Sequence, residues 1–392
     1  MSGKRTIRRF IVVCLSALAF VVIAALLVIR IRYGGGTADF PDRTSNPLFS
    51  FDVVEKVADL PKPPGNLAVS SDGRLFFSFH PEGRPDIRVA ELVDGKVVPY
   101  PSIAFQGAFQ GAGKSEVCFD TVLSVRIDSQ NRLWTLDLAN HGLGQPRLLA
   151  FDLKTDRLIH RFDFSGSTAG PGSHLNDFQI DPAGENIYIA DASIFAKTPA
   201  ILVYNIKNRH CRRVLEKDIS VMPEDFIPVV QGRKMLVFGI FAIRPGVDSI
   251  ALDKSGEWLY YAPVTNNYMY RIQTKFLKDA SLSSIQLSSH VEKFALKTMS
   301  DGLTMDVAGN IYITDPEHSA IVRLQSDGKL ETLLKNPDLR WPDGLGYGPD
   351  GWLYITCSAL HQVIGKTPGS VKSHGPYQIY RFRPGVPGIP GQ

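Results

Sequence analysis

Amide and carboxylate side chains recur immediately before apolar stretches that alternate like β-strands. The recurrent position is held by Asn176, Asp248, Asp301 and Asp343, while Asn66 and Asp177 lie one residue further along their own stretches. If these stretches converge on one axis, the carboxylates repel one another and their pKa values shift unless a cation or a ligand compensates the charge. Oxygen donors suit Ca²⁺, whereas zinc prefers His and Cys, which the position lacks. The pattern therefore predicts a divalent cation, most simply Ca²⁺, or a bound ligand.

Turn capping is the competing explanation, since Asp and Asn before a strand often bond their own backbone. Four such residues in register favour a site over capping. Candidate pocket residues near the same ends are Phe195, His318 and Trp341, together with His174, Asn267 and His361. No Ser-His-Asp or Cys-His order with a nucleophile elbow is visible, so covalent catalysis has no support.

A repeated unit must position these residues. It consists of a short apolar strand, a turn with Asp or Gly, and an alternating strand, and it occurs six times. The copies are NLAVSSDGRLFFSF, SVRIDSQNRLWTLD, DFQIDPAGENIYIAD, SIALDKSGEWLYYAP, GLTMDVAGNIYITD and GLGYGPDGWLYITC. Further hairpin-like runs between copies give about four strands per unit, which is typical of propeller blades. The sequence therefore predicts an all-β fold, a six-bladed β-propeller over residues 50–392.

Two segments fall outside this repeat. The strand-like run FSFDVVEKV at residues 50–58 precedes the first copy, while the last copy lacks a strand, so we expect the N-terminal strand to complete the last blade. Residues 217–246 are too long for a hairpin turn, and loops of that size are often functional lids.

The N-terminus has the features of a membrane anchor. Residues 10–29 are uncharged and mostly apolar, about the length of a membrane-spanning helix. Four basic residues lie within residues 1–9, which predicts a cytoplasmic N-terminus and an extracytoplasmic C-terminal part, periplasmic or extracellular. Residues 30–49 read as a flexible tether. A cleaved signal peptide, which would leave a secreted protein, is the alternative.

The remaining composition excludes some classes of protein. The net charge is only +4 and no basic stripe or recognised module is present, so nucleic-acid binding is excluded. Outside the apolar N-terminal run lie three cysteines, Cys118, Cys211 and Cys357. Because they are odd in number and form no CxxC pair, a zinc site is not indicated and at most one bridge is expected.

The motifs RLWTLD, RLLAFDLKTDRL, HLNDFQID, GVDSIALD, SDGLTMDVAGNIYITDPEHSAI and WPDGLGYGPDGWLYIT resemble the bacterial branch of the major royal jelly protein/yellow family. The resemblance covers nearly everything from about residue 50 onward. It implies a secreted six-bladed propeller, and some members are linked to dopachrome-like substrates or to binding small amines.

A more distant resemblance is to the gluconolactonase/senescence marker protein family, whose propellers hold a divalent cation. It implies a substrate contact at Asn176, a metal ligand at Asp248, and a ligand and catalytic residue at Asp301. The family's first-blade Glu is replaced by Gly65 and Asn66, so Asn66 or Asp343 has to supply the lost oxygen.

Three functions follow from these observations. The first is a Ca²⁺-dependent lactonase-like or esterase-like hydrolase, or a dopachrome-type isomerase, with Asp301 moving the proton. The second is a non-catalytic binder of a small amine or catechol, with Trp341 or Phe195 as an aromatic wall. Its counter-charges would be Asp248, Asp301 and Asp343, and its further contacts Asn176, Asp177 and His318. The third is an envelope scaffold with a protein partner that the sequence does not identify.

Overall fold

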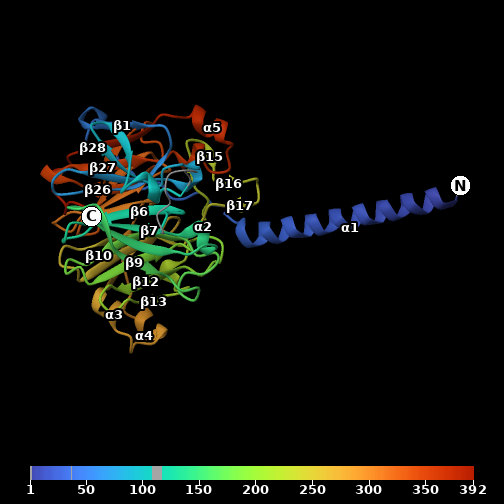
Figure 1. Cartoon of the computed structure of the whole chain (residues 1–392), viewed down its shortest axis with the longest axis horizontal. Helices are drawn as coiled ribbons and strands as arrows, with labels where there is room; N and C mark the ends of the chain where they lie inside the picture. Colours follow the sequence, from blue (N-terminus) through green and yellow to red (C-terminus); the bar gives the residue numbers. More distant parts are fainter. Residues whose placement is uncertain (1, 37, 108–116) are drawn as a thin grey trace.

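The computed structural model describes residues 2–36, 38–107 and 117–392. Its first element is a long helix, α1 (Ser2–Tyr33), which projects from the remainder of the chain as a single rod (Figure 1). Within Ile7–Tyr33 the most apolar 18-residue window has a mean hydropathy of 3.2, and that window is not buried against the protein. A helix of this length and composition can cross a membrane, and a signal sequence has the same features.

The remainder of the described chain forms a six-bladed β-propeller, which confirms the predicted fold. Every blade is a four-stranded antiparallel sheet. Blade one consists of β2 to β5 (Pro64–Val69, Leu75–Phe79, Val89–Val93, Lys96–Pro99) and blade two of β6 to β9 (Val122–Ile127, Arg132–Asp137, Arg147–Asp152, Arg157–Asp163). Blade three consists of β10 to β13 (Leu175–Ile180, Asn186–Asp191, Ala200–Asn205, His210–Val214) and blade four of β18 to β21 (Val247–Leu252, Trp258–Pro263, Tyr268–Gln273, Glu292–Leu296). Blade five consists of β22 to β25 (Leu303–Met305, Ile311–Asp315, Ala320–Leu324, Leu330–Lys335).

Blade six joins the two ends of the propeller chain. It contains β26 (Pro342–Tyr347), β27 (Leu353–Cys357), β28 (Tyr377–Phe382) and, as its outermost strand, β1 (Glu55–Leu60). The predicted closure by an N-terminal strand is therefore confirmed, although the strand begins five residues later than expected, because residues 51–53 form a 3₁₀ turn. Ala58 opposes Ile379 and Leu60 opposes Tyr377 in the antiparallel register.

The innermost strands are buried at nearly every residue. In β2, β6 and β18 no side chain is exposed, because neighbouring blades cover both faces, and such strands are rich in small and apolar residues. Hydroxyl groups on the second strands fix the spacing between neighbouring blades. Ser78 donates to the carbonyl of Leu123 across 2.6 Å, and Thr314 donates to the carbonyl of Asp343 across 3.1 Å.

Glycine allows the inner strands to approach one another at the end where the candidate residues Asp301 and Asp343 lie. A Cβ on Gly302 would lie 2.0 Å from the carbonyl oxygen of Asp343, and one on Gly344 would lie 2.8 Å from the Cα of Asn66. The Asp-Gly pairs at 301–302 and 343–344 are therefore not turn pairs. Each glycine lets its blade pack against the next one, and the preceding aspartate is held at the channel mouth.

The remaining elements decorate the ring. Between blades three and four lie two hairpins, β14 (Val229–Val230) with β15 (Arg233–Lys234) and β16 (Leu236–Val237) with β17 (Phe241–Ala242). Short helices are α2 (Ala139–Gly142), α3 (Thr274–Lys278), α4 (Ser284–Ser288) and α5 (Pro368–Ser373). Within the predicted tether, Phe40 is buried against Val264 and Met299, and Ala38 forms a bridge with Phe226. Cys211 and Cys357 are both free thiols.

Candidate functional site

A cavity of about 150 Å³ opens at the mouth of the channel where the inner strands begin. Its floor carries Asn176, Asp248, Asp301 and Asp343, so the structure brings four predicted residues from consecutive blades together. Phe195 and Trp341 also line the cavity, and the segment 217–246 contributes Pro228, Phe241, Ile243 and Pro245 to its lining.

Asp301 is the most connected of these carboxyls. Its Oδ2 accepts a hydrogen bond from the indole N–H of Trp341 at 2.5 Å, and the carboxyl also pairs with that of Asp248. Asp343 is near enough to Asp301 for like-charge repulsion. Asp248 is almost fully buried, and burial together with the charge of Asp301 raises its pKa well above the ordinary value. Because the two carboxyls interact, their protons belong to the pair.

The same environment raises the pKa of the Asp301 carboxyl toward neutral pH. Burial raises the pKa of Asp301 to about 6, against the hydrogen bonds from Asp248 and Trp341, which lower it. Burial and the charge of Asp301 also raise the pKa of Asp343 well above its ordinary value. A carboxyl with a pKa near 6 can accept and return a proton at physiological pH, as a general base or acid must.

Asn66 and Asp177 lie beside the pocket lining and are engaged by a buried arginine, Arg126. The guanidinium of Arg126 donates to Oδ1 of Asn66 and lies 3.9 Å from Oδ2 of Asp177, while Nδ2 of Asn66 donates to Asp177 at 2.8 Å. The oxygen of Asn66 that was predicted as a cation ligand therefore already accepts a hydrogen bond. Asp177 has a positive partner, whereas the three carboxyls of the pocket floor have none of comparable proximity among the described residues.

His318 is positioned away from this cavity. Its ring bonds Asp315 at 2.9 Å and lies 3.3 Å from Asp42, and these carboxylates raise its pKa. Of the additional candidates, His174 lines the cavity, whereas Asn267 bonds Glu224 and Arg43, and His361 stacks behind Trp341 at 6.4 Å.

Two further histidines, His80 and His141, line the cavity and were not predicted. Nδ1 of His141 lies 2.9 Å from Nδ1 of His174, so one ring must donate and the other accept, and burial lowers the pKa of His174 to about 3. His80 also lines the cavity, and burial lowers its pKa to about 3. These rings are therefore neutral at physiological pH and act as hydrogen-bonding groups.

His141 is positioned by a strained left-handed turn of the backbone. Ala139, Asn140 and His141 have φ values of 49°, 50° and 57°, a run that costs about 1 kcal/mol or more per residue for residues with a Cβ. No spacing in the sequence signals this left-handed turn. Arg126, by contrast, lies between Val125 and Ile127 in the first strand of its repeat copy. Because that strand is the innermost one of the blade, the sequence could have indicated a buried charge there.

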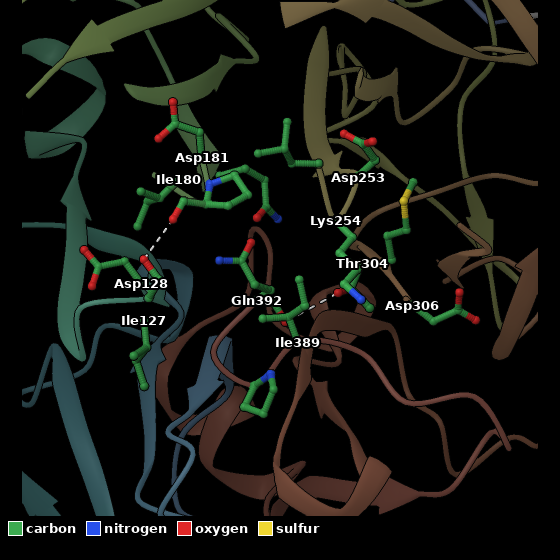
Figure 2. Close-up of a pocket in the computed structure, with 16 residues that line it drawn as sticks. Ile127, Asp128, Ile180, Asp181, Asp253, Lys254, Thr304, Asp306, Ile389 and Gln392 are labelled. Carbon is green, nitrogen blue, oxygen red and sulfur yellow. Dashed lines mark hydrogen bonds between the residues drawn. The ribbon is translucent and has the colours of Figure 1, made fainter. Parts of the chain in front are cut away.

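The aspartates at the opposite mouth of the channel have a different role. Figure 2 shows a second pocket in which Asp128, Asp181, Asp253 and Asp306 surround the end of the chain near Gln392. These aspartates cap turns: Asp128 accepts from the backbone of Gln130 and Arg132, and Asp306 from that of Ala308 and Asn310. Capping therefore explains the aspartates at the far mouth, whereas those of the first mouth contact one another.

The donor set of the first mouth suits a hard cation. Asn176, Asp248, Asp301 and Asp343 offer only oxygen, and ionisation of all three carboxyls would leave uncompensated buried charge. Their side chains do not converge into a formed metal centre among the described residues. The residue types fit a divalent cation, whose charge would favour the ionised form of these carboxyls.

Fold and site together define a class of protein: a six-bladed propeller with an acidic, aromatic-walled pocket at one channel mouth. The model of the family described as "Major royal jelly protein" matches residues 120–369, and the chain belongs to that family. Major royal jelly protein 3 of Apis mellifera is 25% identical over 228 residues, which are 55% of this chain and 39% of the relative. Major royal jelly protein 6 is 26% identical over 210 residues, or 50% and 45%. The match thus spans less than half the length of these curated relatives.

Solved structures support the fold alone, because their sequence identities are low. A luciferin-regenerating enzyme aligns with a TM-score of 0.55 at 15% identity, covering 86% of this chain and 98% of that one. A gluconolactonase from Xanthomonas campestris aligns with a TM-score of 0.52 at 14% identity, covering 85% and 89%. Regucalcin from Agrobacterium tumefaciens, described as a calcium-binding protein, aligns with a TM-score of 0.53 at 14% identity, covering 86% and 96%.

Proposed function

We propose that this protein is a membrane-anchored extracytoplasmic hydrolase that acts on a small lactone or ester in the pocket above Asp301. The observation that carries the proposal is the buried Asp301 carboxyl, whose pKa of about 6 lies in the range of a general base and whose position is fixed by Trp341. The cavity of about 150 Å³ holds a small molecule with its polar end at the carboxyls and its apolar part along Phe195 and Phe241.

The reaction needs one water and no redox partner. Asp301 accepts a proton from water as the water oxygen bonds to the carbonyl carbon of the substrate. The ester C–O bond then breaks, and the leaving oxygen takes the proton back from Asp301, so that a hydroxy acid or an acid and an alcohol result. The neutral His141 and His174, which line the same pocket, would offer hydrogen bonds to the substrate.

A divalent cation, most simply Ca²⁺, fits the same floor. Asp248, Asp301 and Asp343 would hold it, and when bound it would polarise the substrate carbonyl as a Lewis acid. The uncompensated carboxyls support this part of the proposal, as does the name of the calcium-binding structural neighbour.

Binding without turnover is the second candidate function. An aromatic wall of Trp341 and Phe195 above three carboxyls is the chemistry that recognises a small amine, and a catechol would add hydrogen bonds to the histidines. A scaffold role would leave the pocket residues without effect on function.

One pair of variants distinguishes the hydrolase from the binding protein. Asp301→Asn keeps the shape of the pocket and removes the base, so turnover of a panel of lactones and aryl esters should fall at least about 100-fold while ligand-induced thermal shifts persist. Asp253→Asn, at the opposite mouth, is the matched control and should retain turnover. Hydrolysis that survives in Asp301→Asn would refute the catalytic role, and thermal shifts by small amines without any hydrolysis would favour the binding protein.

A further inference from the structure

The outer end of α1 contacts the rim of the pocket directly. The hydroxyl of Tyr33 donates to the carbonyl of Phe195 across 2.9 Å, and the Tyr33 ring stacks on Phe241 at a centroid distance of 5.1 Å. Phe195 and Phe241 both line the cavity described above. Figure 1 shows α1 leaving the propeller beside the β16–β17 hairpin. The pocket therefore opens at the face to which the apolar helix is joined.

Helix length sets how far that face lies from a bilayer. The 27 residues of Ile7–Tyr33 give a helix of about 40 Å, which is close to the thickness of a bilayer with its headgroups, about 40–45 Å. Tyr33 then lies at the outer interface, where tyrosine is enriched. Gly36 is already bonded to Asp225 at 2.9 Å, and three residues of chain span at most about 10 Å. The pocket rim is thus kept at the level of the headgroups.

The residues around the mouth have the composition of an interfacial surface. Phe238, at the tip of the β16–β17 hairpin, is 83% exposed, and Leu143, two residues after His141, is 70% exposed. Basic groups accompany them: Arg32 donates to the carbonyl of Ala196 at 3.4 Å, and the ammonium of Lys197 lies 5.3 Å from the centre of the Tyr33 ring. Exposed aromatic and aliphatic side chains beside basic ones are typical of surfaces that lie in a membrane interface.

We propose that this membrane rim, consisting of Tyr33, Leu143, Phe195 and Phe238, rests on the outer leaflet, with the Phe238 ring among the headgroups. The pocket then opens onto the leaflet, and its ligand is an amphipathic molecule that enters from the membrane. Its apolar part lies along Phe195 and Phe241 and its polar end reaches the carboxyl floor. This inference rests on the proposed anchoring by α1.

The contact with lipid can be measured in the full-length protein reconstituted into phosphatidylcholine vesicles. Phe238→Trp adds an indole to the membrane rim, and Ile285→Trp adds one at a residue that is 85% exposed in α4 and distant from α1 in Figure 1. After subtraction of the wild-type signal, vesicles of brominated phosphatidylcholine should quench the added emission of Phe238→Trp at least about twofold. The emission of Ile285→Trp should be unchanged.

A second tryptophan position and a membrane fractionation test the lipid contact and the anchoring separately. Leu143→Trp should be quenched like Phe238→Trp if the rim contacts lipid, even if one of the two variants folds poorly. Equal emission in both lipids at both positions would overturn the rim contact. Release of the chain from cell membranes by alkaline carbonate would instead overturn the anchoring, whereas retention without quenching overturns only the contact.

Discussion

Trp341 and Asp301 are joined by a hydrogen bond of 2.5 Å, although forty residues separate them in the chain. Trp341 makes this bond from a backbone φ of 51°, a conformation that a bulky residue rarely adopts. The strained turn before blade six thus delivers an indole N–H to the carboxylate that starts blade five. Strain of this kind persists where the surrounding structure maintains it. Here it positions the indole N–H whose hydrogen bond lowers the pKa of Asp301.

Removal of that bond should raise the pKa of Asp301. Trp341→Phe retains an aromatic wall but removes the donor that favours the ionised carboxyl, so the pKa should rise above its value of about 6. Carbon-13 NMR titration of the aspartate carboxyls measures this shift. Trp258→Phe is the control, because Trp258 packs against Arg271 in blade four and does not line the pocket. An unchanged or lowered pKa in Trp341→Phe would contradict the assignment.

The pocket floor should make the protein less stable as pH rises. The folded pKa values of Asp248, Asp301 and Asp343 lie above the ordinary value of 3.8, so the folded state binds protons that the unfolded state has released. These three carboxyls therefore contribute most to stability below about pH 4, and their contribution is lost as pH rises toward the folded pKa, which is about 6 for Asp301. Asp248→Asn removes one of these carboxyls and should raise the free energy of unfolding by about 1–2 kcal/mol at pH 7.5.

Urea unfolding of Asp248→Asn and of the wild type at pH 4.5 and 7.5 measures this effect. The gain should shrink at pH 4.5, where the wild-type carboxyls retain their protons. Asp253→Asn at the opposite mouth keeps the oxygen that accepts from the backbone of Trp258, so its stability relative to the wild type should be the same at both pH values. Equal pH slopes for Asp248→Asn and the wild type would refute the charge repulsion.

Arg126 should be essential to the stability of the channel. Arg126→Met leaves Asp177 buried without its cation and Asn66 without its donor, a loss of about 3 kcal/mol or more. Asp177→Asn in the same chain removes the unpaired charge and should restore about 1–2 kcal/mol of that loss. Chemical denaturation of the two single variants and the double variant completes the cycle. A double variant no more stable than Arg126→Met would mean that the arginine acts through packing alone.

Closure of the ring should depend on β1. Leu60 is 1% exposed in the core shared by blades six and one, so Leu60→Ala should cost about 2–4 kcal/mol, measured as a loss in the urea midpoint. Lys56→Ala, in the same strand but exposed, should cost less than about 0.5 kcal/mol. If both substitutions proved equally mild, β1 would not close the propeller.

The sequence by itself determined the architecture. Six copies of one unit and the unpaired N-terminal strand are local patterns, and a four-stranded sheet that cannot bury its faces alone must stack into a ring. The same register placed Asn176, Asp248, Asp301 and Asp343 at one mouth, because each precedes an inner strand. The apolar N-terminal run was equally plain, although its length fits both an anchor and a signal sequence.

Only the tertiary structure decided which of these groups meet. The engagement of Asn66 by Arg126, the bond from Trp341 to Asp301 and the pairing of His141 with His174 join residues 33 to 60 positions apart. They depend on blade packing and on left-handed turns that leave no periodic mark in the chain. The pKa of Asp301 follows from burial and neighbours in space, so the sequence could identify the carboxylate, whereas the fold determined its chemistry.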